Sequence, residues 1–273
     1  MSIPGPLGPL EAALLGLVEG LTEYLPVSST GHLILTSWLL GRTGDPGLDA
    51  YEIVIQSGAI LAVVGLYRGR IVEMLSGLAG RNPAGRQLLI NLTVGVLPAL
   101  VLGVLLEKPI DRWLFHPGPV AAALAVGGLA MLACEPLRRR RVEDGVGLEQ
   151  LNWRQALAIG LAQCVAMWPG TSRSLATILG GLAAGLRPPA AAEFSFLLAL
   201  PTLLAATGYS LVKDGPQIAA SVTPLSAFVG IAVAMVSAAL AVKGFVHWLG
   251  HHGLQPFAVY RILLAAAVFF ALR

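Results

Sequence analysis

Residues 19–32 read Glu19-Gly-Leu-Thr-Glu23-Tyr-Leu-Pro26-Val-Ser28-Ser29-Thr30-Gly31-His32, a polar stretch with apolar residues on both sides. It combines two carboxylates, the hydroxyl run 28–30, a proline, two glycines and a histidine. An ionisable group at the depth of a bilayer costs several kcal/mol, about 2.5–3.5 on insertion scales. Because such groups are usually retained for a site, we expect the functional site in this stretch.

The composition is that of an integral membrane protein. The chain has 273 residues, of which 56% are hydrophobic and 12% are charged, and its mean hydropathy is +0.75. Soluble domains carry about 25% charged residues. The net charge of +3 does not indicate nucleic acid as a partner, because the arginines lie in short loops between apolar runs. Cys134 and Cys164 form neither a disulfide framework nor a metal-ligand spacing.

Six apolar runs are long enough to cross a hydrocarbon core of about 30 Å. Two further segments, 8–41 and 151–186, are long but broken near the middle, at 25–31 and at 168–174. Proline and glycine end a helix, and irregular backbone at membrane depth is tolerated only inside protein or beside a watery cavity. We therefore predict a re-entrant helix–loop–helix for each broken segment; a kinked span is the alternative. The six predicted spans are residues 49–67, 87–106, 118–137, 190–212, 224–248 and 256–272.

The two halves of the chain repeat. A shift of 144 residues places Gly16–Glu19 on Gly160–Gln163 and Ser28 on Ser172, and Glu52 falls on Glu193 at a slightly different offset. Each half then holds a re-entrant pair followed by three spans, and because three is odd the repeat must have inverted topology. The predicted fold is one all-α polytopic membrane domain over 1–273, with repeat 1 at 1–137, a cytoplasmic linker at 138–150 and repeat 2 at 151–273.

The basic residues predict the orientation. With the N-terminus outside, twelve Lys and Arg residues fall in inner loops and five in outer loops, which satisfies the positive-inside rule. Both termini are therefore predicted outside, and the two re-entrant loops should meet near the midplane from opposite faces. The inner set is Arg68, Arg70, Arg81, Arg86, Arg138, Arg139, Arg140, Arg141, Arg154, Arg187, Lys243 and Arg261; the outer set is Arg42, Lys108, Arg112, Lys213 and Arg273.

Glu19 and Glu23 are four residues apart and so share one helix face. Two carboxylates at the end of a broken helix offer hard oxygen ligands for a divalent cation. One of them can instead serve as a general base if burial raises its pKa. The structural alternative is that they only hydrogen-bond the backbone across the break.

The same break carries a candidate nucleophile. Ser28, Ser29 and Thr30 offer hydroxyl groups, and His32 lies two to four residues away, where it could accept the proton of a serine. The hydroxyls could equally cap the helix that follows. We expect catalysis by Ser29 with His32, with Ser28 and Thr30 contacting the substrate.

The second break indicates an anion site. Pro169-Gly170-Thr171-Ser172-Arg173-Ser174-Leu-Ala-Thr177 combines a glycine, hydroxyl groups and the backbone N–H groups of a helix start. Arg173 supplies a planar fork of donors suited to phosphate. We predict that Gly170, Thr171, Ser172, Ser174 and Thr177 bind the substrate around Arg173. The alternative is that Arg173 pairs with Glu19 or Glu23 as a structural bridge.

Together these parts indicate phosphoryl transfer, and their position in the membrane indicates a lipid phosphate as substrate. The alternative of another class is a secondary transporter or lipid-phosphate flippase, because inverted repeats with broken helices are typical of transporters. Gly127-Gly128 and Gly180-Gly181 can pack helices within one chain or between two, so a homodimer stays open.

At these two motifs the chain resembles the bacterial undecaprenyl-diphosphate phosphatases, the bacitracin-resistance proteins. Residues 19–32 are similar to the family's glutamate-rich motif and Pro169–Ser174 to its second motif. The resemblance extends to Tyr51–Gln56 and Ala192–Phe196 and covers nearly the whole chain.

The resemblance implies hydrolysis of undecaprenyl diphosphate to the monophosphate and phosphate, which recycles the lipid carrier of cell-wall synthesis and counters bacitracin. It also implies a divalent cation, Mg²⁺ or Ca²⁺, and a site open to the outer face of the bacterial inner membrane. The family's functional positions carry over as Glu19, Glu23, Ser29, His32 and Arg173. We expect Glu19 and Glu23 to hold the metal, Ser29 to attack the terminal phosphorus and His32 to manage its proton; His32 as nucleophile, or activating water directly, is the rival mechanism.

Overall fold

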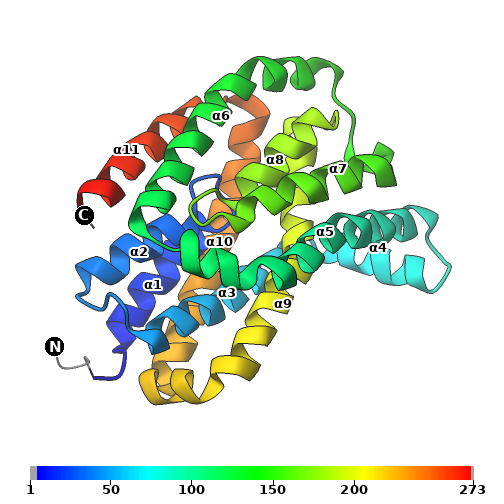
Figure 1. Ribbon diagram of the computed structural model, residues 1–273. Helices are drawn as coiled ribbons and strands as arrows, with labels where there is room; N and C mark the ends of the chain where they lie inside the picture. The colour runs from blue at the N-terminus through cyan, green and yellow to red at the C-terminus, as the bar shows by residue number, and fades with distance from the viewer. Residues whose placement is uncertain (1–4, 272–273) are drawn as a thin grey trace.

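The computed structural model describes residues 5–271, and this part of the chain is helical, with no β-strand among the described residues (Figure 1). Prolines start many of the helices at their first or second position, where the missing N–H is not needed. The helices are α1 Pro9–Thr22, α2 Ser29–Leu39, α3 Pro46–Leu66, α4 Arg68–Leu78, α5 Pro83–Trp113, α6 Pro117–Asp144, α7 Trp153–Cys164, α8 Arg173–Ala183, α9 Pro188–Ser221, α10 Pro224–His251 and α11 Gln255–Ala271, with short 3-10 turns at Leu148–Gln150 and Val165–Met167.

Five of the described helices are long and apolar enough to cross a membrane: α3, α5, α6, α9 and α10. They match five of the six predicted spans. The sixth predicted span corresponds to α11, an apolar helix of 17 residues, which is at the short end of the range of about 17–25 residues. Residue 272 of that span and Arg273 of the outer set lie outside the described residues.

An additional helix lies between the first two spans. Residues 68–78, two of which were counted above among inner-loop arginines, form α4, which packs on the start of α5. Two glycines permit the close approach: a Cβ on Gly77 would lie 2.2 Å from the backbone N of Arg86, and one on Gly85 would lie 1.9 Å from the carbonyl of Glu73. The sequence was misread because apolar and charged residues alternate along α4 at helical spacing, so no continuous apolar run marks the helix.

Ion pairs tie α4 to the second half of the chain. Arg70 contacts Glu193 at the start of α9 at 2.8 Å and Glu149 at 2.6 Å, besides Glu73 on its own helix. The hydrogen bond from Arg70 lowers the pKa of the Glu149 carboxyl.

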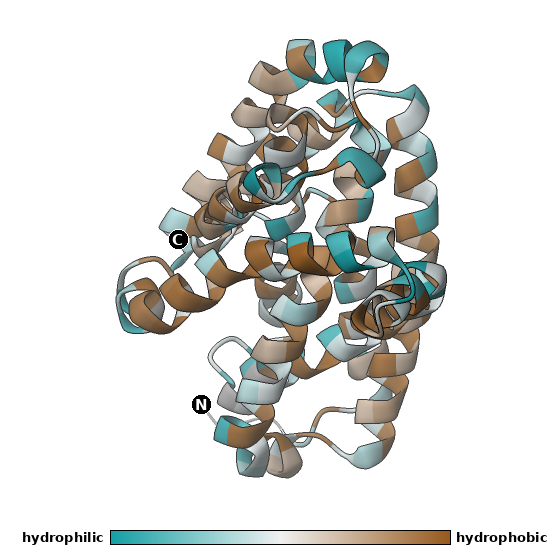
Figure 2. Ribbon diagram, turned by 90° about the vertical axis from the view of Figure 1, so that its right-hand side faces the viewer, coloured by the Kyte–Doolittle hydropathy of each residue, from teal (hydrophilic) through white to brown (hydrophobic). Residues whose placement is uncertain are grey.

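Helix α6 continues to Asp144, so the arginines at the start of the predicted linker are helical. The polar end of α6 lies at the top of Figure 2, coloured teal.

Both broken segments consist of two helices joined by a short loop, α1–α2 and α7–α8 (Figure 1). Ser28 and Ser172, which the shift of 144 residues makes equivalent, precede α2 and α8. They are the only residues other than glycine with positive φ in the described chain, at 73° and 77°. Each hydroxyl accepts a hydrogen bond from the first turn of the helix that it precedes, from Gly31 N and Leu175 N respectively. The capping alternative therefore holds for Ser28, and the two loops have the same local structure.

Helix packing follows the same equivalence. Helix α1 of the first half packs on α10 of the second half, and α7 of the second half packs on α5 of the first. Each crossing depends on a pair of glycines: a Cβ on Gly16 would lie 2.2 Å from the carbonyl oxygen of Gly230, and one on Gly160 would lie 2.2 Å from that of Gly95. The equivalent helices α3 and α9 also pack on each other across the halves, as do α6 and α11. The four glycines considered for a dimer also face inward, since Gly127 and Gly128 meet α11, Gly180 meets α7 and Gly181 meets α9.

Candidate functional site

The loops of the two broken segments meet inside the protein, side by side at the centre of Figure 1. The Ser174 hydroxyl donates to the carbonyl of Leu25 at 2.8 Å. The guanidinium of Arg173 donates through Nη2 to Glu23 Oε1 at 3.0 Å. Residues about 150 positions apart in the sequence are thereby brought into one site.

A cavity of ≈ 160 Å³ lies between the loops. Its polar wall comes from both of them and from Gln56 of α3. It adjoins a larger cavity of ≈ 630 Å³ that shares Ser29, Thr30 and Gln56. The larger cavity extends past Glu52 to Thr43, in the loop between α2 and α3, and to Asp214 of α9. The residues around the smaller cavity are Glu23, Ser28, Ser29, Thr30, Gln56, Ala166, Pro169, Gly170, Ser172, Arg173 and Leu203.

Glu23 connects the candidate nucleophile to the candidate anion-binding group. Ser29 Oγ donates to Glu23 Oε2 at 2.7 Å, while Arg173 bonds to the other carboxylate oxygen. The side chains of Glu23 and Arg173 are 7% and 11% exposed, so little water screens the pair. A carboxylate in this position can accept the Ser29 proton.

The guanidinium of Arg173 has hydrogen-bond donors that protein groups do not use. Its Nη1 donates to the carbonyl of Ser195 on α9 at 3.0 Å, and the guanidinium lies 5.7 Å from the centroid of the Tyr24 ring. Its Nε is buried with no hydrogen-bond partner. Such an unsatisfied buried donor needs an explanation, and an oxygen of a bound anion at the cavity would supply one.

Glu19 lies one turn before Glu23 and is fully buried, and neither of its carboxylate oxygens has a hydrogen-bond partner. Its repeat equivalent Gln163 is also buried and unsatisfied. Glu19 does not line either cavity. No group of three or more His, Cys, Asp or Glu residues arranged to hold a metal occurs among residues 5–271. A cation at Glu19 and Glu23 would therefore need oxygen ligands from the substrate or water to complete its shell.

His32 points away from Ser29 and the cavity. Its Nδ1 bonds to the carbonyl of Ser28 at 2.7 Å and its Nε2 to the hydroxyl of Tyr260 at 2.6 Å, with the Tyr260 ring stacked on the imidazole. In this arrangement both ring nitrogens are engaged and neither contacts Ser29. A role for His32 in moving the Ser29 proton stays a prediction.

Of the remaining predicted residues around the second loop, some line the cavity and others are buried behind its wall. Gly170, at a φ of 94°, and Ser172 line the cavity. Thr171, Ser174 and Thr177 are buried beside it rather than on its wall. Thr177 Oγ1 donates to the carbonyl of Arg173 at 2.8 Å and bonds to Ser195 Oγ at 2.6 Å, so Thr177 supports the helix start that carries Arg173.

Sequence reasoning missed two neighbours of the site on α11. Tyr260 holds His32, and Arg261, counted above as an inner-loop residue, is fully buried. The inner-loop assignment of Arg261 is wrong, because its guanidinium bonds to the carbonyls of Pro26 and Gly170 in the two loops. The available signal was an arginine several residues inside the last apolar run. Ser195, which contributes a carbonyl to Arg173, lies within Ala192–Phe196, a stretch covered by the resemblance but given no role there.

The chain is similar to known proteins over nearly its whole length. The family model "Bacitracin resistance protein BacA" matches residues 12–267. An "Undecaprenyl-diphosphatase" of Sorangium cellulosum is 49% identical over 260 residues, covering 94% of this chain and 84% of that protein. Those of Methylococcus capsulatus and Rhodospirillum rubrum ("Undecaprenyl-diphosphatase 2") are 50% and 47% identical, each covering 95% of this chain and 93% of the relative. With its two motifs facing one cavity, and with matches over nearly its whole length, the chain belongs to the BacA family of bacitracin resistance proteins.

Proposed function

We propose that this membrane protein hydrolyses undecaprenyl diphosphate to undecaprenyl phosphate and inorganic phosphate, and so confers resistance to bacitracin. The family and the names of the similar proteins support the reaction and the substrate. The observation that carries it is the Arg173–Glu23–Ser29 chain of hydrogen bonds on the wall of the cavity between the two loops. It places an anion-binding group, a proton acceptor and a nucleophile within one site.

In the proposed mechanism Arg173 binds the terminal phosphate, with Ser172 and the backbone around Gly170 on the same wall. Ser29 Oγ gives its proton to Glu23 and forms a bond to the terminal phosphorus. The bond from that phosphorus to the bridging oxygen breaks, and undecaprenyl phosphate leaves with the electron pair. Water then hydrolyses the phosphoserine and releases phosphate. Attack by water, with Glu23 as its base, is the version without a covalent intermediate, and His32 as nucleophile requires its ring to leave Tyr260.

A divalent cation, Mg²⁺ or Ca²⁺, fits the acidic side of the site. The support is Glu19, whose two buried oxygens lack any partner in the structure, together with Glu23 one turn away. The cation would neutralise charge on the phosphate oxygens. Glu19 would hold it, while Glu23 would share its carboxylate between the cation and Ser29.

We further propose that the chain forms an inverted-topology repeat of two re-entrant segments and six spans in the bacterial inner membrane, with both termini and the site on the outer face. The matching loops at Ser28 and Ser172 and the matching glycine crossings support the repeat. Without Arg261 the basic residues still divide eleven inside to five outside. The wider cavity extends to Thr43, Phe115 and Asp214, which lie at predicted outer ends of helices.

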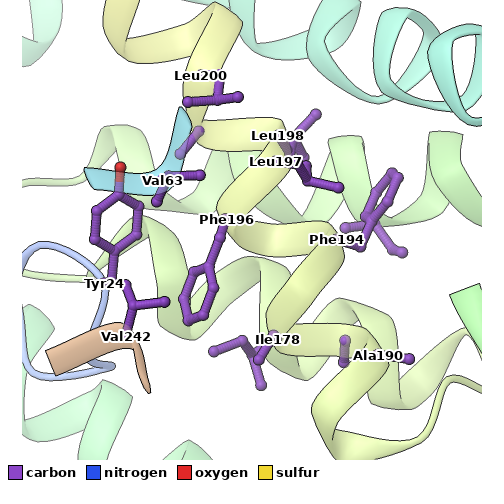
Figure 3. Close-up of a cluster of buried hydrophobic side chains, with 14 of the residues drawn as sticks. Tyr24, Val63, Ile178, Ala190, Phe194, Phe196, Leu197, Leu198, Leu200 and Val242 are labelled. Atoms are coloured by element: carbon purple, nitrogen blue, oxygen red, sulfur yellow. The ribbon is translucent and has the colours of Figure 1, made fainter. Parts of the chain in front are cut away.

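The positions of repeat 2 that correspond to the cavity wall of repeat 1 are buried, and this difference favours an enzyme over a transporter. Ile34, Ile53 and Gln56 line the wider cavity; their repeat equivalents Ile178, Phe194 and Leu197 are fully buried in the apolar cluster of Figure 3. A transporter must open to both faces in turn, whereas the compared positions line a cavity in the first repeat and are buried in the second.

Phosphate release from undecaprenyl diphosphate tests the proposal. Purified protein in detergent should release phosphate with Mg²⁺ or Ca²⁺ present, and Arg173→Ala should abolish release without unfolding the protein. Detergent removes the two compartments that transport needs, so release by the wild type separates hydrolysis from transport. A folded wild type that releases no phosphate with either cation would refute the enzyme, and flux in liposomes would then test the transporter or flippase. A homodimer stays a prediction, which sedimentation of the detergent-solubilised protein tests.

A further inference from the structure

Arg261 of α11 is a fully buried arginine with no part in the mechanism above. Burying a charged group costs several kcal/mol unless its hydrogen bonds are replaced. Among the described residues, the four hydrogen bonds of its guanidinium go to backbone carbonyls rather than to a carboxylate. A charge placed at such cost, and satisfied by main chain alone, fixes the position of the backbone around it.

The four acceptors connect the parts that form the site. Two belong to α6, Ala123 at 3.2 Å and Leu124 at 3.3 Å. The other two belong to the two loops, Pro26 at 3.2 Å and Gly170 at 3.0 Å. The shift of 144 residues makes Pro26 and Gly170 equivalent to each other. One planar guanidinium therefore holds the same point of both loops and anchors them to α6.

The two bonds to the loops lie close to the reacting groups in the chain. Pro26 precedes Ser29 by three residues, and Gly170 precedes Arg173 by three. We propose that Arg261 is a positioning residue that keeps the two loops in register, so that Ser29 and Glu23 of one loop face Arg173 of the other. The proposal rests on the proposed function, because it assigns Arg261 a role in that same reaction.

Gly127 of α6 provides the space for this guanidinium. A Cβ on Gly127 would lie 2.2 Å from Arg261 Nη2 and 2.8 Å from its Cζ. Gly127→Ala therefore displaces the guanidinium while leaving Arg261 in the protein. Its neighbour Gly128 provides a matched control: a Cβ there would lie 2.9 Å from the carbonyl of Ala258 and from Ile262, on the same helix α11 but away from the guanidinium.

The test measures kcat and KM for phosphate release from undecaprenyl diphosphate, together with the Tm in detergent. The variants are Gly127→Ala, Gly128→Ala and Arg261→Lys. We expect Gly127→Ala to lower kcat by about 100-fold, the typical effect of misplacing reacting groups by about 1 Å, with a much smaller change in KM. Gly128→Ala should keep the wild-type kcat. Arg261→Lys should fall between them, because an ammonium keeps the charge and three donors but not the planar fork.

Two results would overturn the proposal. One is a wild-type kcat in folded Gly127→Ala or folded Arg261→Lys, even if the Tm falls, because the role of Arg261 would then be structural only. The other is an equal loss of kcat in Gly127→Ala and Gly128→Ala, because the cause would then be the spacing of α6 and α11. Absence of phosphate release by the wild type itself would instead refute the proposed function. If Gly127→Ala does not fold, the comparison of Arg261→Lys with Gly128→Ala decides the question.

Discussion

Glu23→Gln is the sharpest test of the proposed chemistry, because the amide keeps the shape of the carboxylate but cannot take a proton. In the structure Glu23 Oε2 accepts from Ser29 Oγ at 2.7 Å and Oε1 accepts from Arg173 at 3.0 Å. An amide oxygen can still accept from Arg173, so the anion site should survive. The Ser29 proton, in contrast, loses its acceptor.

The expected size of the effect follows from the role of a general base. Positioned acid–base groups contribute about 10²–10⁴-fold in rate, which corresponds to about 2.7–5.4 kcal/mol of activation free energy. The pair with Arg173 is mostly buried, and removing one partner of a buried pair costs up to about 3–5 kcal/mol of stability. We therefore expect a kcat at least 100-fold lower and a lower Tm, with phosphate release and thermal unfolding measured on the same detergent sample.

Glu11→Gln is the matched control for the loss of stability. Glu11 lies on the same helix α1, its carboxylate bonds to Arg42 at 3.2 Å, and it lines neither cavity of the site. This variant should lose stability and keep the wild-type kcat. The reasoning would be refuted by a folded Glu23→Gln that keeps more than about a tenth of the wild-type kcat, since less than the lower limit of 10²-fold for a general base would then be lost.

Three further outcomes are expected. Removing divalent cations with EDTA should abolish phosphate release, and Glu19→Gln should raise the cation concentration needed for half-maximal rate; full activity in EDTA would exclude the metal role. Gly160→Ala should destabilise the protein by about 1–3 kcal/mol through overpacking against Gly95, measured as a lower Tm. Gly103→Ala should leave the Tm unchanged, because a Cβ there has nothing within 4 Å. Equal Tm values for the two variants would argue against the close contact of α7 and α5. Ser28→Gly should keep or raise the Tm, because glycine relieves the positive φ and costs only a few tenths of a kcal/mol as a cap, and a large fall would contradict this account of the loop.

Apolar runs and breaks in the sequence predicted most of the fold. The spans follow from hydropathy, because a helix surrounded by lipid must be apolar over its whole length. The same rule explains why α4 was missed: Arg70 and Glu73 interrupt its apolar residues, and their ion pairs, including the one with Glu193, exist only in three dimensions. The ends of α5 and α9 were underestimated because helices continue past the apolar part into polar residues.

The sequence predicted which residues form much of the candidate site but not which of them contact each other. Motif spacing identified Glu23, Ser29 and Arg173, and the structure brings these three together. Spacing also suggested His32 as the partner of Ser29, since the two are three residues apart. Backbone geometry decides otherwise: the break turns the first helical residues so that Ser29 meets Glu23 while His32 meets Tyr260 of α11. Contacts made by a helix more than 220 residues later are not readable from a local motif.

The two broken segments have the same backbone structure at their loops but carry different charged side chains, and this difference produces the site. The shift of 144 residues pairs Glu19 with Gln163, Glu23 with Met167 and Ser29 with Arg173. A symmetric crossing would bring like groups together, and two buried carboxylates or two buried arginines in contact would repel each other at low dielectric. Here one segment carries the carboxylates and the other carries the arginine. The two form an ion pair beside the cavity, where we expect the arginine also to bind a phosphate. The residue that holds both loops, Arg261, bonds to their equivalent carbonyls at Pro26 and Gly170, so the shared backbone sets the geometry while the diverged side chains supply the chemistry.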